Sequence, residues 1–591
     1  MDAQMEKDFI KGGAFLIENR NASEIFTPED LSEEQRMIGE TTRDFIDNEV
    51  MPNLEAMENH DWELARQLVH KAGELGLLGA NIPEEYGGLD LDQTTGVVVA
   101  ENMGRASGFG VTFGSQTSIG LLPILYFGSD FLKEKYIPGI VSGEKVTAYC
   151  LSESGSGSDA LGAKANAKLS EDGTHYVLNG EKMWISNGSF SDYFIVFAKV
   201  DGEKKKFSAF VVERSETCRP GAEEHKMGIK SSSTTPLILS DCKVPTENLI
   251  GEVGDGAKIA FNILNVGRFK LGASATGGMK LAVHQSIRYA NEREQFNVPI
   301  SSFGAMKHKL AEMAIQTWVA EAMSYRTVGM IDALIGEDGG DKEKKLRSIE
   351  EYAVESSINK VWCSEALDYV VDEMVQIYGG AGYSADYPAE KAYRDARINR
   401  IFEGTNEINR LLIPGQLLKK AMKGELGLLK AAKDLQGELL NPQMSFDEET
   451  GALAMEMKLA QNAKKVALMV VGTATQKYMT ELQSQQEILM NAADIIMNAY
   501  AMETAILRAQ KFAEKGNAEN QIDMAQVFCN DAMQRIEMAA RNTIAAMSDG
   551  DEGKMLLVAL KRFTKNNSPV NTIAARQRIA DTLIAANKYV F

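Results

Sequence analysis

The hydrophobic pattern of this chain changes twice along its length, and these two changes limit the possible folds more than any other feature. Apolar residues recur at helical spacing from Ser32 to about Arg105, and the helical pattern continues to about Ile140. Between about 146 and 250 they form short runs of strand character, bounded by Gly, Asn, Asp and Ser. Long amphipathic patterns return after Gly256. Strands and helices therefore do not alternate, and a doubly wound nucleotide-binding fold is not expected.

Local signals sharpen this outline at three places. Ser32 followed three residues later by Gln35 predicts the start of a helix. The pair Asn179-Gly180 predicts a hairpin turn within a small antiparallel β domain, because both residues tolerate positive φ. The stretch from Gly380 to Ala385 fits the G-x-G-x-x-A pattern of dinucleotide sites, but no strand precedes it. We interpret that stretch as part of a different cofactor geometry.

The chain is expected to be mainly α-helical with a central β domain, in four parts. These are an N-terminal α-helical domain (1–145), a middle β domain (146–255), an α-helical bundle (256–425) and a C-terminal helical extension (426–591). The extension is rich in Ala, Met and Gln, and its Met and Ala stripes favour helix packing. The link after residue 430 contains no strongly basic amphipathic helix, so membrane contact is expected to be peripheral at most.

Composition argues against several classes of protein. A formal net charge of -20 over 591 residues disfavours nucleic-acid binding, since the phosphate backbone would repel the chain. The five cysteines are widely spaced and the six histidines show no metal-type spacing, so neither a disulfide framework nor a metal site is expected. The N-terminus resembles neither a signal nor a transit peptide, and no run of about 18 apolar residues occurs. A cytoplasmic protein without a membrane span is expected.

The segment from Gln376 to Arg410 carries the strongest functional signal. A glycine run from Gly379 to Gly382 would let backbone approach a flat ligand closely, and an arginine-rich stretch then leads to a turn with Glu403. A carboxylate on such a turn can face a buried cleft, where desolvation would raise its pKa toward the range of a general base. A glutamate near a helix start more often serves only the helix terminus, and this segment alone does not decide between the two.

Three further motifs could contribute to a ligand site, although each has a structural alternative. The glycines and serines of Tyr149–Asp159 could bring N–H groups and hydroxyls to an anion or a polar ring edge, or could form a plain turn. Trp184, two residues before Ser186, could cover a ring or could be a core residue. The segment Arg293–Phe296 ends a helical pattern, where the arginine could pair with a phosphate or lie on the surface.

Together these four motifs, spanning about 150 to 410, resemble in type and order the signatures of the acyl-CoA dehydrogenase family. With the C-terminal extension counted, the whole chain is most similar to the very-long-chain branch of that family. Two residues depart from the family's flavin loop: Ser152 stands where threonine is usual, and Ser154 stands where proline is usual. Gly267 stands where relatives that carry the catalytic base on this helix have a glutamate. The resemblance therefore implies that the base is Glu403.

The resemblance implies an FAD-dependent dehydrogenase with an N-terminal helical domain, an antiparallel β-barrel domain and a C-terminal helical bundle. In the reaction of that family, Glu403 would remove the α proton of a fatty acyl-CoA thioester while the β hydrogen passes as hydride to flavin N5. The product would be the trans-2-enoyl-CoA of fatty acid β-oxidation. The residues implied to bind FAD are Tyr149, Leu151, Ser152, Gly157, Ser158, Trp184, Ile185, Ser186, Arg293, Gln295, Phe296, Phe303, Gln376, Ile377, Gly379, Gly380, Thr405 and Glu407.

The resemblance also implies where the thioester and its acyl chain lie. The backbone N–H of Glu403 and a ribityl hydroxyl of FAD would polarise the thioester carbonyl. In residues 111–120, small side chains occupy places where a medium-chain relative closes its cavity with a bulky acid, so a deep slot for a long acyl chain is expected. The residues implied to contact the substrate are Ser158, Gly114, Ser115, Asn265, Arg268, Phe402 and Gly404.

The resemblance leaves partners and two alternative functions open. Electrons are expected to pass to an electron-transfer flavoprotein, and a homodimer is expected because the extension would cover the face that shorter relatives use to form tetramers. An acyl-CoA oxidase that reduces oxygen would share every motif. A flavoprotein scaffold, similar to a relative that assists respiratory-complex assembly, would share the fold with little catalysis. A nucleic-acid-binding relative ranks last, because residues 430–591 are close to neutral.

Overall fold

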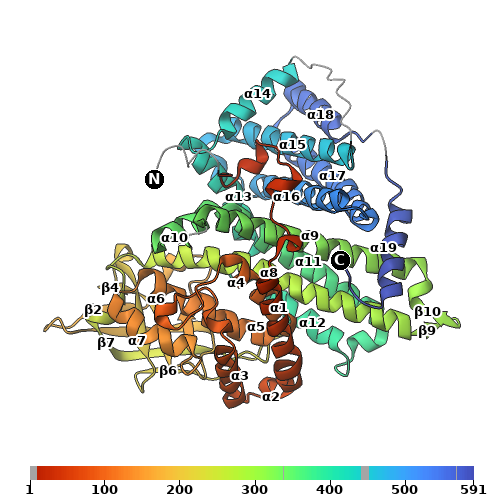
Figure 1. Cartoon of the computed structure of the whole chain (residues 1–591). Coiled ribbons are helices and arrows are strands. Elements are labelled where there is room, and N and C mark those ends of the chain that lie inside the picture. Colours follow the sequence, from red (N-terminus) through yellow and green to blue (C-terminus); the bar gives the residue numbers. More distant parts are fainter. Residues whose placement is uncertain (1–8, 337–338, 441–450, 567–568) are drawn as a thin grey trace.

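The protein is a helical body with a β-sheet on one side and a further group of helices on top (Figure 1). A computed structural model describes residues 9–336, 339–440, 451–566 and 569–591. Residues 441–450, which are part of the link after residue 430, lie outside the described residues. The prediction of at most peripheral membrane contact through this link therefore stays a prediction. In the described part of the chain, no helix is long and apolar enough to span a membrane.

The first part of the chain is helical, as its periodicity predicts. The predicted cap starts the first helix: Ser32 Oγ accepts a hydrogen bond from Gln35 N at 3.1 Å, and Gln35 Oε1 accepts one from Ser32 N at 2.9 Å. A π-helical turn, η10 (Ser115–Gly120), follows the fifth helix and falls in the predicted tail pocket. The helices are α1 (Glu33–Phe45), α2 (Leu54–Glu58), α3 (Trp62–Glu74), α4 (Gln93–Met103), α5 (Ser107–Gly114), α6 (Leu122–Phe127) and α7 (Asp130–Val141).

An eight-stranded sheet follows, on the left of Figure 1. Its strand order is β6-β7-β3-β2-β4-β5-β8, with β1 beside β4. The pairing is mostly antiparallel, but β4 lies parallel to both β1 and β2, which sequence alone did not indicate. The strands are β1 (Thr147–Cys150), β2 (Asn166–Leu169), β3 (His175–Ser186), β4 (Tyr193–Val200), β5 (Phe207–Glu213), β6 (Cys218–Pro220), β7 (Thr234–Pro245) and β8 (Leu249–Ile250).

The hairpin predicted at Asn179-Gly180 is wrong, because β3 runs straight through both residues. The pairing of β3 with β7 shifts register between Leu178 and Gly180, so the pair forms an irregularity within one strand. Gly180 has φ 150°, and a Cβ there would lie 2.8 Å from the Cβ of Ala165. Asn179 is held by Asp241, whose N–H donates to Asn179 Oδ1 at 2.8 Å. The glycine permits close approach of a neighbouring strand rather than a chain reversal.

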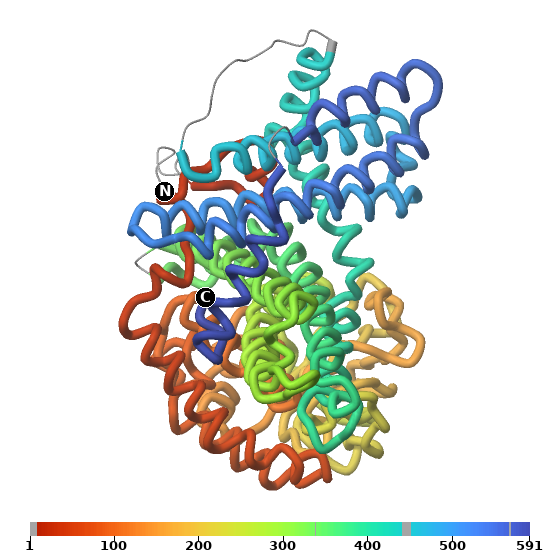
Figure 2. Tube along the Cα trace, turned by 90° about the vertical axis from the view of Figure 1, so that its right-hand side faces the viewer, coloured from red at the N-terminus to blue at the C-terminus, as the bar shows by residue number. Residues whose placement is uncertain are grey.

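The helical body is built around two long helices, α8 and α11, that pack side by side (Figure 2). A small β-hairpin of β9 (Glu294–Gln295) and β10 (Val298–Pro299) joins α8 to α9 and projects at one end of the body (Figure 1). The helices of this part are α8 (Gly256–Glu292), α9 (Gly304–Ile335), α10 (Lys342–Glu351), α11 (Ala353–Tyr378), α12 (Pro388–Ala396) and α13 (Asn406–Met422).

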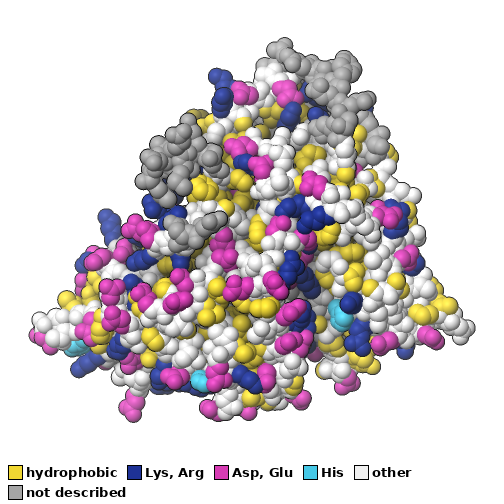
Figure 3. Space-filling model, in the orientation of Figure 1, with side chains coloured by type: hydrophobic (Ala, Val, Ile, Leu, Met, Phe, Trp, Pro, Cys, Tyr) yellow, Lys and Arg dark blue, Asp and Glu magenta, His cyan; other side chains and the backbone are white. Residues whose placement is uncertain are grey.

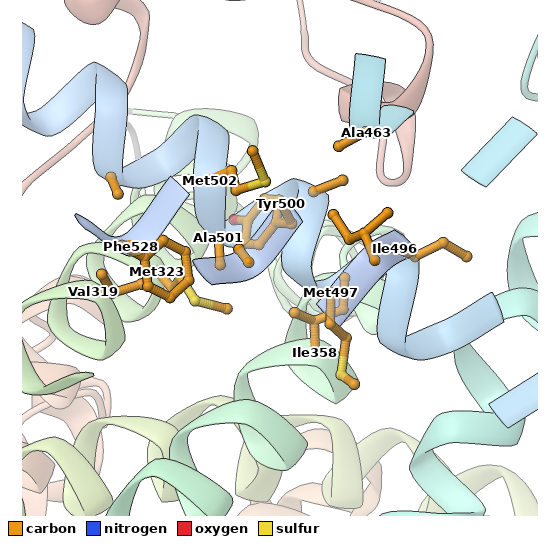
Figure 4. Packing of buried hydrophobic residues seen from close by; sticks show 14 of the residues in the cluster. Val319, Met323, Ile358, Ala463, Ile496, Met497, Tyr500, Ala501, Met502 and Phe528 are labelled. Atoms are coloured by element: carbon orange, nitrogen blue, oxygen red, sulfur yellow. The ribbon is translucent and has the colours of Figure 1, made fainter. Parts of the chain in front are cut away.

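The C-terminal helices share one hydrophobic core with the helical body. In Figure 4, Met497, Tyr500 and Phe528 of the extension lie among Met323 of α9 and Ile358 of α11. The Met and Ala stripes of the extension are thus used for packing. The helices are α14 (Leu428–Leu440), α15 (Ala454–Tyr478), α16 (Gln486–Lys515), α17 (Glu519–Met547), α18 (Gly550–Thr564) and α19 (Thr572–Ala586). The last of them, α19, returns from the extension to pack against α9 of the helical body (Figure 1).

Charged side chains of both signs are interspersed over the face of the molecule shown in Figure 3. Lysines and arginines there have aspartates and glutamates as near neighbours, with hydrophobic patches between them. A mixed surface of this kind provides little of the continuous positive potential with which proteins attract nucleic acids.

Candidate active site

A cavity of about 200 Å³ lies between α5, η10, α8 and the turn that carries Glu403. Its lining is mainly apolar or small, with glycine and serine contributed by both α5 and α8 and alanine by α8. Five residues that the sequence singled out meet on its wall: Gly114, Ser115, Ser186, Phe402 and Glu403. Because these come from three separate parts of the chain, the cavity is the strongest candidate for a binding site.

The turn with Glu403 lies between η16 (Arg397–Arg400) and α13, in a strained conformation. Glu403 has φ 57° and Gly404 has φ 78°, so a non-glycine residue occupies the left-handed region. Thr405 caps α13, with its Oγ1 accepting from Ile408 N at 3.3 Å. Asn409 Nδ2 donates to the carbonyls of Gly404 at 2.9 Å and Thr405 at 3.1 Å. Such strain persists only where surrounding bonds enforce it, and it is common at active sites.

The carboxylate of Glu403 is buried without a hydrogen-bond partner on Oε2 among the described residues. It lies against Gly267 of α8, where an added Cβ would come within 2.6 Å of Oε2. Burial raises the pKa of Glu403 to about 7, against the opposing effect of the positive charges of Arg268 and Lys360. A carboxylate that is half protonated near neutral pH and faces a cavity has the properties of a general base.

Arg268 and Asn265, predicted as substrate contacts, support the backbone of this turn. Both side chains are buried on α8. Arg268 Nε donates to the carbonyl oxygen of Glu403 at 3.4 Å, and its Nη1 donates to Asn265 Oδ1 at 2.8 Å. Burial lowers the pKa of the Arg268 guanidinium, although the Glu403 carboxylate opposes this. In this structure the pair positions the turn.

Sequence reasoning missed Lys360, a buried lysine on α11. Its Nζ donates to Asn406 Oδ1 at 2.7 Å, at the start of α13. Burial lowers the pKa of Lys360 to about 7, against the effect of the nearby Glu403 carboxylate. The sequence offers no clear signal for it, because the helical neighbours of Lys360 include the polar residues Ser356, Ser357 and Ser364.

A chain of polar contacts connects the Glu403 turn to the extension. Asn406 Nδ2 donates to Glu365 Oε1 at 3.0 Å, and Glu365 pairs with Arg410 through both oxygens, at 2.6 and 2.8 Å. Arg410 Nε then donates to Asp494 Oδ1 of α16 at 2.8 Å. The extension is thus bonded directly to the helix that follows the Glu403 turn.

The predicted flavin residues of the middle domain lie on or near β1 and β3, and of these only Ser186 is part of the cavity lining among the described residues. Trp184 has φ 62° and is 59% exposed, which excludes its alternative role as a core residue. Ile185 is buried next to it, and Ser186 reaches the cavity wall. The hydroxyl of Tyr149 is buried without a partner among the described residues. Burial, with a smaller effect of the Glu403 carboxylate, raises the pKa of Tyr149 well above its usual range.

Four glycines among the predicted contact residues have open space beside them. At Gly114, Gly157, Gly379 and Gly380 an added Cβ would have no described atom within 4 Å, so side-chain packing does not require glycine there. At Gly379 the backbone does, because its φ of 59° lies in the region that favours glycine. Leu151 and Ser152 are half-buried, whereas Gly157 and Ser158 are exposed, and Ser152 O accepts from Met183 N at 2.9 Å. An uncovered indole, an unpartnered phenol and open backbone together fit a flat cofactor with polar edges.

Other predicted cofactor residues lie outside the cavity wall. Phe296 on the β9-β10 hairpin is 86% exposed, with its ring 6.0 Å from that of Phe303. Arg293 and Gln295 are also exposed. Gln376, Gly379 and Gly380 are exposed at the end of α11, Ile377 is buried, and Thr405 and Glu407 begin α13, with Glu407 exposed.

Comparison with known sequences matches four parts of the chain to domains described for one family. Residues 32–144 match "Acyl-CoA dehydrogenase, N-terminal domain" and 148–242 match the middle domain. Residues 254–418 match the C-terminal domain, and a second description, also a C-terminal domain, matches 462–562.

Three relatives are similar over most of the chain. A "Probable acyl-CoA dehydrogenase" of Bacillus subtilis (strain 168) is 48% identical, covering 99% of this chain and 100% of that protein. The mitochondrial "Very long-chain specific acyl-CoA dehydrogenase" of Rattus norvegicus is 35% identical, covering 83% of this chain and 77% of that protein. The crystal structure of an acyl-CoA dehydrogenase complexed with FAD from Bacillus anthracis has a TM-score of 0.95 at 50% identity, covering 98% and 100% of the two chains.

Proposed function

The chain belongs to the acyl-CoA dehydrogenase family, and from this premise we propose that it oxidises long-chain fatty acyl-CoA thioesters to trans-2-enoyl-CoA, with Glu403 as the base. The observation that carries this proposal is the unpartnered Glu403 carboxylate, which faces the cavity with a pKa of about 7. The cofactor of the family is FAD, which when bound supplies the acceptor for the β hydride.

The Glu403 carboxylate is the group that takes the α proton. It fills the space opposite Gly267, so the acid reaches the cavity from the turn while α8 leaves room for it. Arg268 fixes the carbonyl of the same residue, and Asn409 fixes the carbonyls of the two residues that follow. The side chain can therefore hold its position without a hydrogen bond to its own carboxylate, which would compete with the substrate proton.

The backbone N–H of Glu403 supports the second requirement, polarisation of the thioester carbonyl. No described residue accepts a hydrogen bond from this N–H, and the turn leaves it available beside the carboxylate. A preorganised donor that stabilises the developing enolate is worth about 3 kcal/mol. The apolar lining of the cavity excludes water and strengthens that interaction.

We propose that the tail of the acyl chain lies along the wall formed by α5 and η10. Gly114 opens onto the cavity, and Ser115 is buried with its hydroxyl unpartnered among the described residues. Glutamate at position 115 would fill this part of the wall and introduce a polar group. Ser115→Glu should shift the preferred acyl chain to shorter lengths, measured as kcat/KM over a series of esters. An unchanged chain-length profile would remove this support for a long-chain slot.

The test of the function is an anaerobic titration of the flavin-loaded protein with acyl-CoA esters of increasing length, followed through the visible flavin spectrum. Bleaching by long-chain esters is expected, and Glu403→Gln should abolish it while the bound flavin remains. A flavin spectrum that no ester changes would favour the scaffold alternative. Reoxidation by an electron-transfer flavoprotein but not by oxygen would separate a dehydrogenase from an oxidase.

We also propose a homodimer in which the β9-β10 hairpin reaches the cofactor of a second copy. The support is that Arg293, Gln295 and Phe296 are exposed on a projecting hairpin, outside the lining of their own cavity (Figure 1). Sedimentation should give a dimer, and Phe296→Ala together with Arg293→Ala should weaken flavin retention. A tetramer, or flavin affinity unchanged in the double variant, would contradict this arrangement.

A further inference from the structure

One cation in the cavity has no role in the reaction as described. Lys270 lies on α8 one turn after Gly267 and lines the cavity together with Gly96, Phe113 and Thr117. The same four residues also line a second, smaller cavity of about 20 Å³, and Asn81 is part of its wall. Since Thr117 belongs to η10, Lys270 lies on the side of the cavity where the acyl tail is placed.

The Lys270 ammonium makes few polar contacts for a charged group at a cavity wall. Its Nζ donates to Asn81 Oδ1 at 3.3 Å, and none of the described acids forms an ion pair with it. On the same helix, Lys280 is paired with both Glu101 and Glu321. Burial alone lowers the pKa of Lys270 to about 8, so the side chain still carries its charge at neutral pH.

A purely structural role does not explain why residue 270 carries a positive charge. Asn81 holds the loop before α4 through its Nδ2, which donates to Leu91 O at 3.2 Å and to the carbonyl of Asp92, and Lys270 satisfies its remaining oxygen. A neutral donor such as glutamine would serve that purpose without burying a charge. An ammonium carries three donors, and the described residues accept from only one of them.

We propose that Lys270 forms an anion subsite in the tail region, which binds a carboxylate at the ω end of the acyl chain. ω-Carboxyacyl-CoA thioesters would then be substrates in addition to unmodified acyl-CoA esters. This inference rests on the proposed function and adds a substrate class to it. A carboxylate matches the single charge of one ammonium, whereas a phosphate would bring a second charge without a partner. In its absence, the aliphatic stem of Lys270 can line the path of an apolar tail.

The test compares two series of CoA esters of equal carbon number, with and without an ω-carboxylate, on the flavin-loaded enzyme. For at least one length the wild type should oxidise the ω-carboxy ester with a kcat/KM within about tenfold of the plain ester. Lys270→Met should lower kcat/KM for that ω-carboxy ester roughly 10- to 100-fold, the fold-change of one charge-assisted hydrogen bond. The same variant should change kcat/KM for the plain ester of equal length by a much smaller factor, so that the preference between the two esters shifts.

Two further variants separate charge from folding. Lys270→Gln keeps a donor for Asn81, so a loss specific to ω-carboxy esters in this variant would come from the missing charge. Lys258→Met, at an exposed lysine of the same helix, should change neither series. Direct binding of both ester types to the Glu403→Gln protein should show the same Lys270-dependent preference without turnover.

Each contrary outcome has a distinct meaning. If plain esters are oxidised and no ω-carboxy ester is, the subsite is refuted while the proposed function stands. If Lys270→Met and Lys270→Gln lower both series equally, Lys270 supports the loop and does not recognise a substrate group. If no ester of either series reduces the flavin, the proposed function itself fails and this inference fails with it.

Discussion

The cavity around Glu403 and the interface between α9 and the extension both bury charged side chains, but they differ in how those charges are compensated. At the interface, Arg326 of α9 pairs with Glu503 of α16 at 2.7 Å, and Lys464 of α15 pairs with the same carboxylate. Glu503 raises the pKa of the buried Arg326, opposing the effect of burial. In the cavity, Glu403 and Lys270 have no ion-pair partner among the described residues.

This difference shows which buried charges serve the fold and which remain available for chemistry. A second interface cluster has the same character, since Arg508 pairs at 2.7 Å with both Glu29 and Glu321. Paired charges fix the relative position of helices. Unpaired charges titrate near neutral pH, which is the range useful for proton transfer and for recognition of an opposite charge. The charges that join helices at these two clusters are paired, whereas Glu403 and Lys270 in the cavity have no ion-pair partner among the described residues.

The largest expected effect comes from neutralising the cavity acid. Glu403→Gln keeps the size of the side chain and removes its ability to accept a proton, so kcat should fall on the order of 10³-fold or more. Single-turnover flavin reduction measures this. Glu487→Gln, at an exposed glutamate of α16, is the matched control and should retain full activity. Activity of Glu403→Gln within tenfold of wild type would mean that the base is another group.

The second effect should appear at the interface and should be structural. Glu503→Ala leaves Arg326 and Lys464 buried without their shared partner, and this should lower the free energy of unfolding by about 3–5 kcal/mol. Urea denaturation of the flavin-loaded protein measures it. Glu537→Ala, which breaks the exposed pair with Arg541, should change the stability by about 1 kcal/mol or less. Equal effects at the two sites would contradict the distinction drawn above.

A third effect concerns what the unpaired acid does to stability. The pKa of Glu403 is raised from 4.5 to about 7, so the folded state disfavours the charged carboxylate. That penalty is absent below pH 4.5, develops between pH 4.5 and 7, and is complete above. Glu403→Gln should therefore be more stable than wild type at pH 8, by roughly 1–3 kcal/mol, with the gain vanishing toward pH 4.5. Thermal unfolding midpoints at several pH values test this, and a pH-independent difference would contradict it.

The smallest expected effect is a shift in pH dependence. Because the reaction needs ionised Glu403, kcat/KM should rise with pH through about 7. Lys360 lowers the pKa of Glu403, so Lys360→Met should move this rise to higher pH by about one pH unit or less, with Lys360→Arg restoring it. The pKa of Lys360 is also about 7, so the rise belongs to the coupled pair. An unmoved pH profile would show that Lys360 acts through Asn406 alone.

Local sequence signals predicted local structure well. The pairing of Ser32 with Gln35 starts α1 as expected, and Glu403 lies on a turn before a helix with Thr405 as its cap. The failure at Asn179-Gly180 has a specific cause, because that glycine is required by the approach of Ala165 from β2's side of the sheet. The sequence of two residues does not specify which strand packs beside them in the folded protein.

The charges of the cavity illustrate what sequence reasoning could not reach. Lys270 and Lys280 are ten residues apart on one helix. Their flanking sequences do not show which of the two lysines has an ion-pair partner. Their difference depends on Glu101 of α4 and Glu321 of α9, which approach Lys280 only in the folded chain. The same holds for Lys360, whose partner Asn406 lies on another helix.

The sequence by itself determined the order of helices and strands and the four family motifs, and its resemblance to the family is the ground on which Glu403 is proposed as the base. Periodicity and short motifs are local properties, so they can be read along the chain. Only the tertiary structure decided that the Glu403 carboxylate lies unpartnered against Gly267, that Lys270 lines the cavity and that the extension is bonded to the helical body. These depend on which distant segments exclude water from a group and which bring it a counter-charge, and both are set by packing.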